Sequence, residues 1–121
     1  MSEMSQHPSA SISHVGICTT DLDRSLRFYT EALGFVHERS IDDIGSPYDR
    51  LMELPGVKCR AHYLKCGGFT IELIGYPDSG VTGSGGRRPM NQPGFTHMTL
   101  VVDDIDAVAA RIVRCGGRVH R

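Results

Sequence analysis

The sequence predicts an α+β fold built from a repeated β-α-β-β-β unit whose second copy is incomplete. An internal repeat is the first observation: "ISHVGICTTDLDRS" aligns without a gap with "FTHMTLVVDDIDAV", which places His14 over His97 and Asp21 over Asp104. The second is that each copy changes from an alternating to a helical apolar pattern, as expected for a strand followed by a helix. The third is a pair of glycines between two β-rich runs, a pattern typical of a hairpin.

The first copy begins with a strand, a helix and a second strand. Apolar residues alternate with polar or small ones over residues 12–19, as in a half-buried strand. Asp21 is the predicted helix N-cap and Gly34 the residue that ends the helix. A second strand is expected over residues 35–42. The apolar stripe of the helix recurs at helical spacing and consists of Leu22, Leu26, Tyr29 and Leu33.

The remaining elements follow from turn residues and from the repeat. Residues 43–56 are rich in Gly and Pro and should form a loop or a short helical turn. The run "KCRAHYLKCGGFTIELIGY" predicts a hairpin that turns at Gly67-Gly68. In the second copy, a strand over 95–102 and a helix over about 104–115 are expected.

These elements divide the chain into four segments. The positions that would match the first hairpin would lie beyond Arg121. We expect that the sequence is a fragment or that a further segment follows it, and natural truncation of the second unit is the alternative. The predicted segments are a flexible tail over residues 1–11, a first βαβββ module over 12–76, a linker over 77–94, and the start of a second module over 95–121.

Composition limits the possible partners. The chain has 121 residues, enough for one compact domain, and a formal net charge of -1. This charge gives no reason to expect nucleic acid or a membrane as partner, and no apolar run is long enough to span a bilayer. The first residues lack the features of a signal peptide. We therefore expect a cytoplasmic protein that acts on a small molecule.

Three side chains that can bind a metal are predicted on one face of the sheet. Strand alternation turns His14 away from the helix, and the repeat does the same for His97. Glu72 alternates with apolar residues in "FTIELIGY", where an unpartnered carboxylate would be costly. Imidazole nitrogen and carboxylate oxygen bind Zn, Ni, Fe, Mn or Co. A two-residue turn would place Tyr63 opposite Glu72 as a hydrogen-bond partner of this metal site.

Other polar residues have simpler interpretations. A single histidine on a strand is usually structural or exposed, and we expect this for His37 and His120 although they repeat. His62 should lie on the core side of the hairpin. Arg87 and Arg88 in the linker are either solvated or in contact with an anionic substrate.

The sequence resembles the vicinal oxygen chelate superfamily, which includes glyoxalase I, methylmalonyl-CoA epimerase, extradiol dioxygenases and bleomycin-resistance proteins. The resemblance rests on "HVGICTTDLDRSLRFYTEALGF", "FTIELIGY" and "PGFTHMTLVVDDIDAV". It implies paired βαβββ modules that form a cleft-shaped mixed sheet around one divalent metal. It also makes a homodimer a reasonable expectation.

The resemblance also implies roles for individual residues. His14, Glu72 and His97 match the family's metal ligands, and a fourth ligand, a glutamate on the last strand, would lie beyond Arg121. A metal-bound glutamate, either Glu72 or the fourth ligand beyond Arg121, is the expected catalytic residue, which would move a proton. Cys18 stands where glyoxalase I carries an arginine for glutathione, which argues against that substrate.

Three functions are compatible with this reading. The first is a metal-dependent lyase or isomerase of glyoxalase type that acts on a small carbonyl substrate through a metal-stabilised enediolate. The second is a ring-cleaving dioxygenase with Fe(II) at the same residues. The third is a metal-free small-molecule binding or resistance protein.

Overall fold

The computed structural model describes residues 9–44, 47–77, 80–83 and 85–120, and it confirms the α+β class. The predicted tail therefore lies mostly outside the described residues. No helix formed by the described residues is long and apolar enough to cross a bilayer. In chain order the elements are β1 (Val15–Cys18), α1 (Leu22–Arg27), the π-helix η1 (Phe28–Ala32), β2 (Val36–Ile44), α2 (Tyr48–Leu51), β3 (Cys59–Cys66), β4 (Phe69–Gly75) and α3 (Ile105–Arg114).

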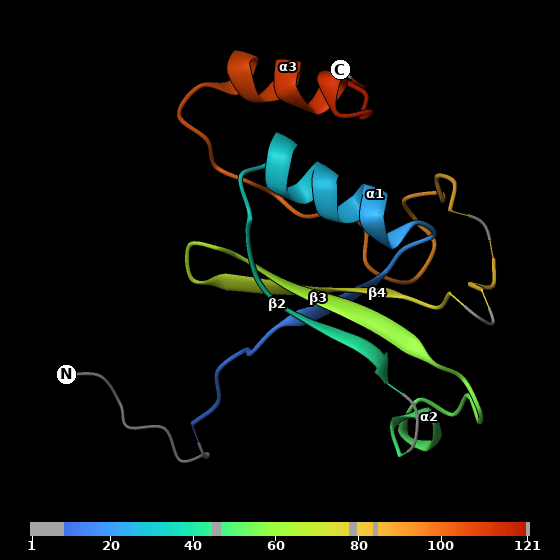
Figure 1. Cartoon of the computed structure of the whole chain (residues 1–121). Coiled ribbons are helices and arrows are strands. Elements are labelled where there is room, and N and C mark those ends of the chain that lie inside the picture. Colours follow the sequence, from blue (N-terminus) through green and yellow to red (C-terminus); the bar gives the residue numbers. More distant parts are fainter. Residues whose placement is uncertain (1–8, 45–46, 78–79, 84, 121) are drawn as a thin grey trace.

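The four strands form one mixed sheet in the order β1-β4-β3-β2. β1 runs parallel to β4, and the other neighbouring strands are antiparallel. Helix α1 lies over one face of this sheet, and α3 stacks on the outer side of α1 (Figure 1). None of the described residues forms a long helix on the opposite face, so it is the face on which a site can open to solvent.

Two caps define the first helix as the sequence predicts. The backbone N–H of Arg24 donates to the Asp21 side chain at 3.1 Å, and Gly34 takes a φ of 78°, which a residue with a side chain rarely adopts. The helix is not uniform, because its second half widens into η1. There the Thr30 hydroxyl donates to the Leu26 carbonyl at 2.8 Å.

The core lies between the sheet and the first helix. Phe35, Leu64, Ile71 and Leu73 are buried together. The predicted apolar stripe packs against them, so its assignment to the core is confirmed for Leu22, Leu26, Tyr29 and Leu33. Burial of this continuous apolar surface is what fixes the helix on the sheet.

The hairpin closes at the predicted glycines. Cys66 pairs with Phe69 across a two-residue turn, in which Gly67 takes a φ of 58°. This turn sets the register, so Tyr63 lies directly opposite Glu72 as predicted. α2 supplies the short helical turn that was one of the two expectations for the loop after β2.

The second copy follows the prediction only in its helix. α3 is capped by Asp104, whose side chain accepts from the Ala107 N–H at 3.0 Å. The prediction of a strand over 95–102 is wrong, because none of the described strands pairs with this segment. A strand needs backbone hydrogen bonds to a neighbour, and here Val101 remains 98% exposed.

Truncation of a core leucine should cost far more stability than truncation of an exposed valine. We expect Leu64→Ala to lower the free energy of unfolding by about 2–5 kcal/mol, because Leu64 is fully buried and the substitution leaves a cavity. Val101→Ala, at the exposed position, should change it by less than about 0.5 kcal/mol. Urea unfolding of both variants checks this. Equal losses would contradict the proposed position of the core.

Candidate functional site

On the face of the sheet that α1 does not cover, residues paired across all four strands form one row. The register places Gly16 of β1 beside Glu72 of β4, Glu72 opposite Tyr63 of β3, and Tyr63 opposite Arg39 of β2. Glu72 lies on this face because its neighbours Ile71 and Leu73 point into the core, and successive side chains on a strand alternate.

His14 and Glu72 meet at the end of this row nearest β1. His14 immediately precedes β1, and its Nε2 lies 3.3 Å from Glu72 Oε1. The two side chains are 35% and 17% exposed, so the pair is accessible but largely shielded. The Ser13 hydroxyl lies 2.9 Å from His14 Nδ1. When Nδ1–H donates to this hydroxyl, the lone pair of Nε2 faces the carboxylate.

This pair fits two ligands of one divalent cation. Zinc binds imidazole nitrogen and carboxylate oxygen at about 2.0–2.2 Å each, which puts neighbouring tetrahedral ligands about 3.4 Å apart. The observed separation is 3.3 Å. The donor types and their spacing are compatible with two ligands of one cation, and the same separation is that of an ordinary ion pair between the two side chains.

Tyr63 connects the pair to the next strand. Its ring and that of His14 are T-shaped to each other with centroids 5.2 Å apart, and the Arg39 guanidinium carbon lies over the Tyr63 ring, 3.9 Å from its centroid. Burial, followed by the charge of Glu72 and a hydrogen bond to it, raises the pKa of Tyr63, and Arg39 partly opposes this. Tyr63 therefore remains a neutral hydrogen-bond donor that can hold the Glu72 carboxylate.

His97 is not part of this cluster. It lines a cavity of about 530 Å³ at the other side of β1, together with Val15, Ile17 and Tyr29, which belong to the helix-covered face. The Thr96 hydroxyl is 2.9 Å from its Nδ1. Within the described ranges, no three His, Cys, Asp or Glu side chains gather as a metal site. The structure thus brings together two of the three predicted ligands.

The two linker arginines contact the second half of the chain. Arg88 donates to the Pro93 carbonyl at 3.3 Å and to the Phe95 carbonyl, and it lines the same cavity as His97. Arg87 lies 3.2 Å from His120 Nε2. Arg88 therefore holds the linker segment in place at the cavity wall.

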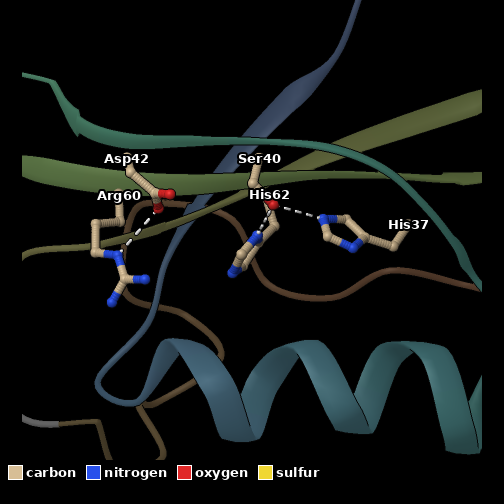
Figure 2. Close-up of polar contacts among 5 residues, drawn as sticks. All are labelled: His37, Ser40, Asp42, Arg60 and His62. Carbon is tan, nitrogen blue, oxygen red and sulfur yellow. Dashed lines mark hydrogen bonds and ion pairs between the residues drawn. The ribbon is translucent and has the colours of Figure 1, made fainter.

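A second polar cluster, which the sequence did not reveal, lies on the helix-covered side of the sheet. The Ser40 hydroxyl is 2.9 Å from His37 Nε2 and 2.8 Å from His62 Nδ1 (Figure 2). His62 is 8% exposed and lies on the core side as predicted. The sequence contains part of this cluster as a signal, because His37 and His62 both lie in predicted strands. The register that sets Ser40 opposite His62 depends on a register shift in β2 between His37 and Arg39. No residue pattern predicts this shift.

The buried imidazole should make stability fall at acid pH. Burial, and then the charges of His37 and Arg60, lower the pKa of His62, while Asp23 and Asp42 oppose this in part. The unfolded chain then binds this proton at a higher pH than the folded chain does, so stability is lost as the pH falls below about 6.5.

Replacement of this imidazole tests the assignment. His62→Gln keeps a hydrogen-bonding group for Ser40 but cannot titrate, so its Tm should fall less than that of the wild type between pH 7.5 and pH 5.5. His120→Gln is the control, because His120 is exposed. An unchanged pH response of His62→Gln would show that another group causes the loss.

Comparisons with known proteins agree with this architecture. A glyoxalase family protein from Bacillus cereus matches with a TM-score of 0.82 and 21% identity, over 94% of this chain and 77% of that one. A glyoxylase/bleomycin resistance protein/dioxygenase domain from Frankia sp. EAN1pec matches with a TM-score of 0.57 and 23% identity, over 90% and 71%. No curated protein matches the chain.

The two solved structures share the fold of this chain, and the family itself is shown by its sequence profile. The profile described as the Glyoxalase/Bleomycin resistance protein/Dioxygenase superfamily matches residues 11–121. This confirms the resemblance inferred from the two module openings and from the β4 segment. The chain belongs to the Glyoxalase/Bleomycin resistance protein/Dioxygenase superfamily.

Proposed function

We propose that the chain is a metal-dependent lyase or isomerase of glyoxalase type that acts on a small carbonyl substrate. The observation that carries the proposal is the 3.3 Å approach of His14 Nε2 and Glu72 Oε1 on the open face of the sheet. Membership of the superfamily supports it, because the predicted ligands lie in the segments that carry the family resemblance.

His14 and Glu72 would hold the cation, and His97 is the proposed third ligand. His97 could join them only if the segment before α3 moved, since His97 now lines a cavity at the other side of β1. A divalent Zn, Ni, Co, Mn or Fe ion would act as a Lewis acid toward two neighbouring oxygens of the substrate. We therefore propose that His14 and Glu72 contribute more to metal affinity than His97 does.

The residues of the chain would perform the proton transfer. Glu72 Oε1 lies 3.3 Å from His14 Nε2, and the Glu72 carboxylate is the group on this face that would accept the proton. Tyr63, which lies directly opposite Glu72, would donate to the carboxylate and keep it in one orientation. Glu72 would take a proton from the carbon beside the substrate carbonyl and return it to the neighbouring carbon.

Removal of either member of the pair should weaken metal binding. We expect His14→Ala and Glu72→Gln each to weaken Co²⁺ or Zn²⁺ binding about 100-fold or more, because each removes one of two adjacent ligands. Calorimetric titration and the Co²⁺ absorption spectrum measure this. His120→Ala, which removes an exposed imidazole elsewhere, serves as the control.

Three results of this titration have different meanings. Retained affinity in both His14→Ala and Glu72→Gln would refute the site. A loss of affinity in His97→Ala as well would show that the segment before α3 does bring His97 to the metal. A wild-type protein that binds none of these ions would instead favour a metal-free binding protein.

The chemistry is tested by proton exchange. With Zn²⁺, Ni²⁺ or Co²⁺ bound, the wild type should exchange the C–H protons beside the carbonyl of hydroxyacetone with deuterium from D₂O. Glu72→Gln should be slower by about 10²–10⁴-fold, because an amide cannot accept the proton. Proton NMR follows the exchange. Exchange that is unaffected by Glu72→Gln would exclude Glu72 as the base, and oxygen uptake on catechol with Fe(II) would favour a dioxygenase.

A further inference from the structure

We propose that Arg39 binds a carboxylate of the substrate, so that the small carbonyl substrate of this site also carries a carboxylate. The inference rests on the proposed function, because it places the chelating oxygens of the same molecule at His14 and Glu72. It adds the substrate class, which neither the fold nor the two proposed metal ligands, His14 and Glu72, provide.

Arg39 differs from the other two cations of the sheet in having no carboxylate partner. Arg60 Nε lies 3.2 Å from Asp42 Oδ1, and Lys65 Nζ lies 3.6 Å from Glu38 Oε2. Among the Asp and Glu side chains that the structure describes, which do not include Asp43 and Asp78, none forms an ion pair with Arg39. Its positive charge is therefore available for an anion from outside the chain.

The position of Arg39 places this charge near His14 and Glu72, the two proposed metal ligands. Its guanidinium carbon lies 3.9 Å from the centroid of the Tyr63 ring, and Tyr63 lies directly opposite Glu72. Arg39 is exposed, and the cation–π contact with the aromatic ring favours this position of the guanidinium. A planar guanidinium packed in this way can still present two parallel N–H groups to a carboxylate.

Strand spacing sets the size of the compound. Neighbouring strands lie about 4.8 Å apart, and the guanidinium rests over Tyr63, one strand away from Glu72. Oxygens bound near Glu72 and a carboxylate bound at Arg39 would thus be separated by roughly one to two strand spacings. A six-membered ring with the carboxylate opposite the two oxygens spans this distance.

The number of charges favours a carboxylate over a phosphate group. A phosphate group carries close to two negative charges and usually collects more than one donor cation. On this face the charge of Lys65 is partly offset by Glu38, whose Oε2 lies 3.6 Å from Lys65 Nζ. A single unpaired guanidinium matches the single charge of a carboxylate.

Two probes that differ only in the carboxylate test the inference. Catechol and 3,4-dihydroxybenzoate share two neighbouring oxygens, and only the second carries a carboxylate across the ring. Their dissociation constants are measured by calorimetry and by the Co²⁺ spectrum, with the Co²⁺-loaded wild type, Arg39→Gln, Arg39→Lys and Arg60→Gln. Arg60→Gln is the matched control, because it removes a strand arginine that already has a partner.

In the wild type and in Arg60→Gln, 3,4-dihydroxybenzoate should bind at least about tenfold more tightly than catechol, as expected for a charge-assisted pair. Arg39→Gln should lose this preference and bind the two probes equally. Arg39→Lys should retain only part of the preference for 3,4-dihydroxybenzoate. It keeps the positive charge but loses the two parallel N–H groups of the guanidinium.

The possible failures are distinguishable. Metal-dependent binding of both probes with the same preference in Arg39→Gln as in the wild type would overturn the role of Arg39 and leave the metal site standing. Equal metal-dependent binding of both probes by the wild type would also overturn the role of Arg39 and leave the metal site standing. If neither probe shows metal-dependent binding, the proposed function and this inference both fail. Thermal unfolding of Arg39→Gln confirms that any loss is not a loss of fold.

Discussion

The structure depends on the alternation of side chains along β4. Ile71 and Leu73 are fully buried under the first helix, and this fixes which face of the strand is inside. Because the period of a strand is two residues, Glu72 then has to lie on the open face. A slip of one residue would bury the carboxylate and expose the two apolar side chains, at a cost in free energy that the domain could not sustain.

Everything proposed for the site follows from that register. The Gly67-Gly68 turn places Tyr63 beside Glu72, the parallel pairing of β1 with β4 brings the chain around His14 next to it, and β2 adds Arg39 on the far side. The core thus holds a row of polar groups in place although it contributes no atom to them. The helix-covered face has a different character, with His37, Ser40 and His62 joined by hydrogen bonds and partly enclosed.

Much of this could be predicted from residue patterns, and the part that could not has physical reasons. Local signals were sufficient for the caps at Asp21 and Asp104, for the turn at Gly67-Gly68 and for Tyr63 opposite Glu72, because each depends on a few neighbouring residues. The segment 95–102 has the pattern of a strand. It forms none because pairing requires a neighbour, and pattern does not reveal whether one is available. The place of His97 depends on that pairing, so it could not be predicted either.

The central claim is that His14 and Glu72 hold one divalent cation, and nitrogen-15 NMR of the histidine side chains tests it most directly. Zinc is added to labelled protein while the imidazole resonances are followed. We predict that one equivalent shifts the Nε2 resonance of His14, with its Nδ1 remaining protonated, and leaves His37 and His62 unchanged. A His14 resonance that does not respond to zinc, or a response confined to His37 and His62, would contradict the account.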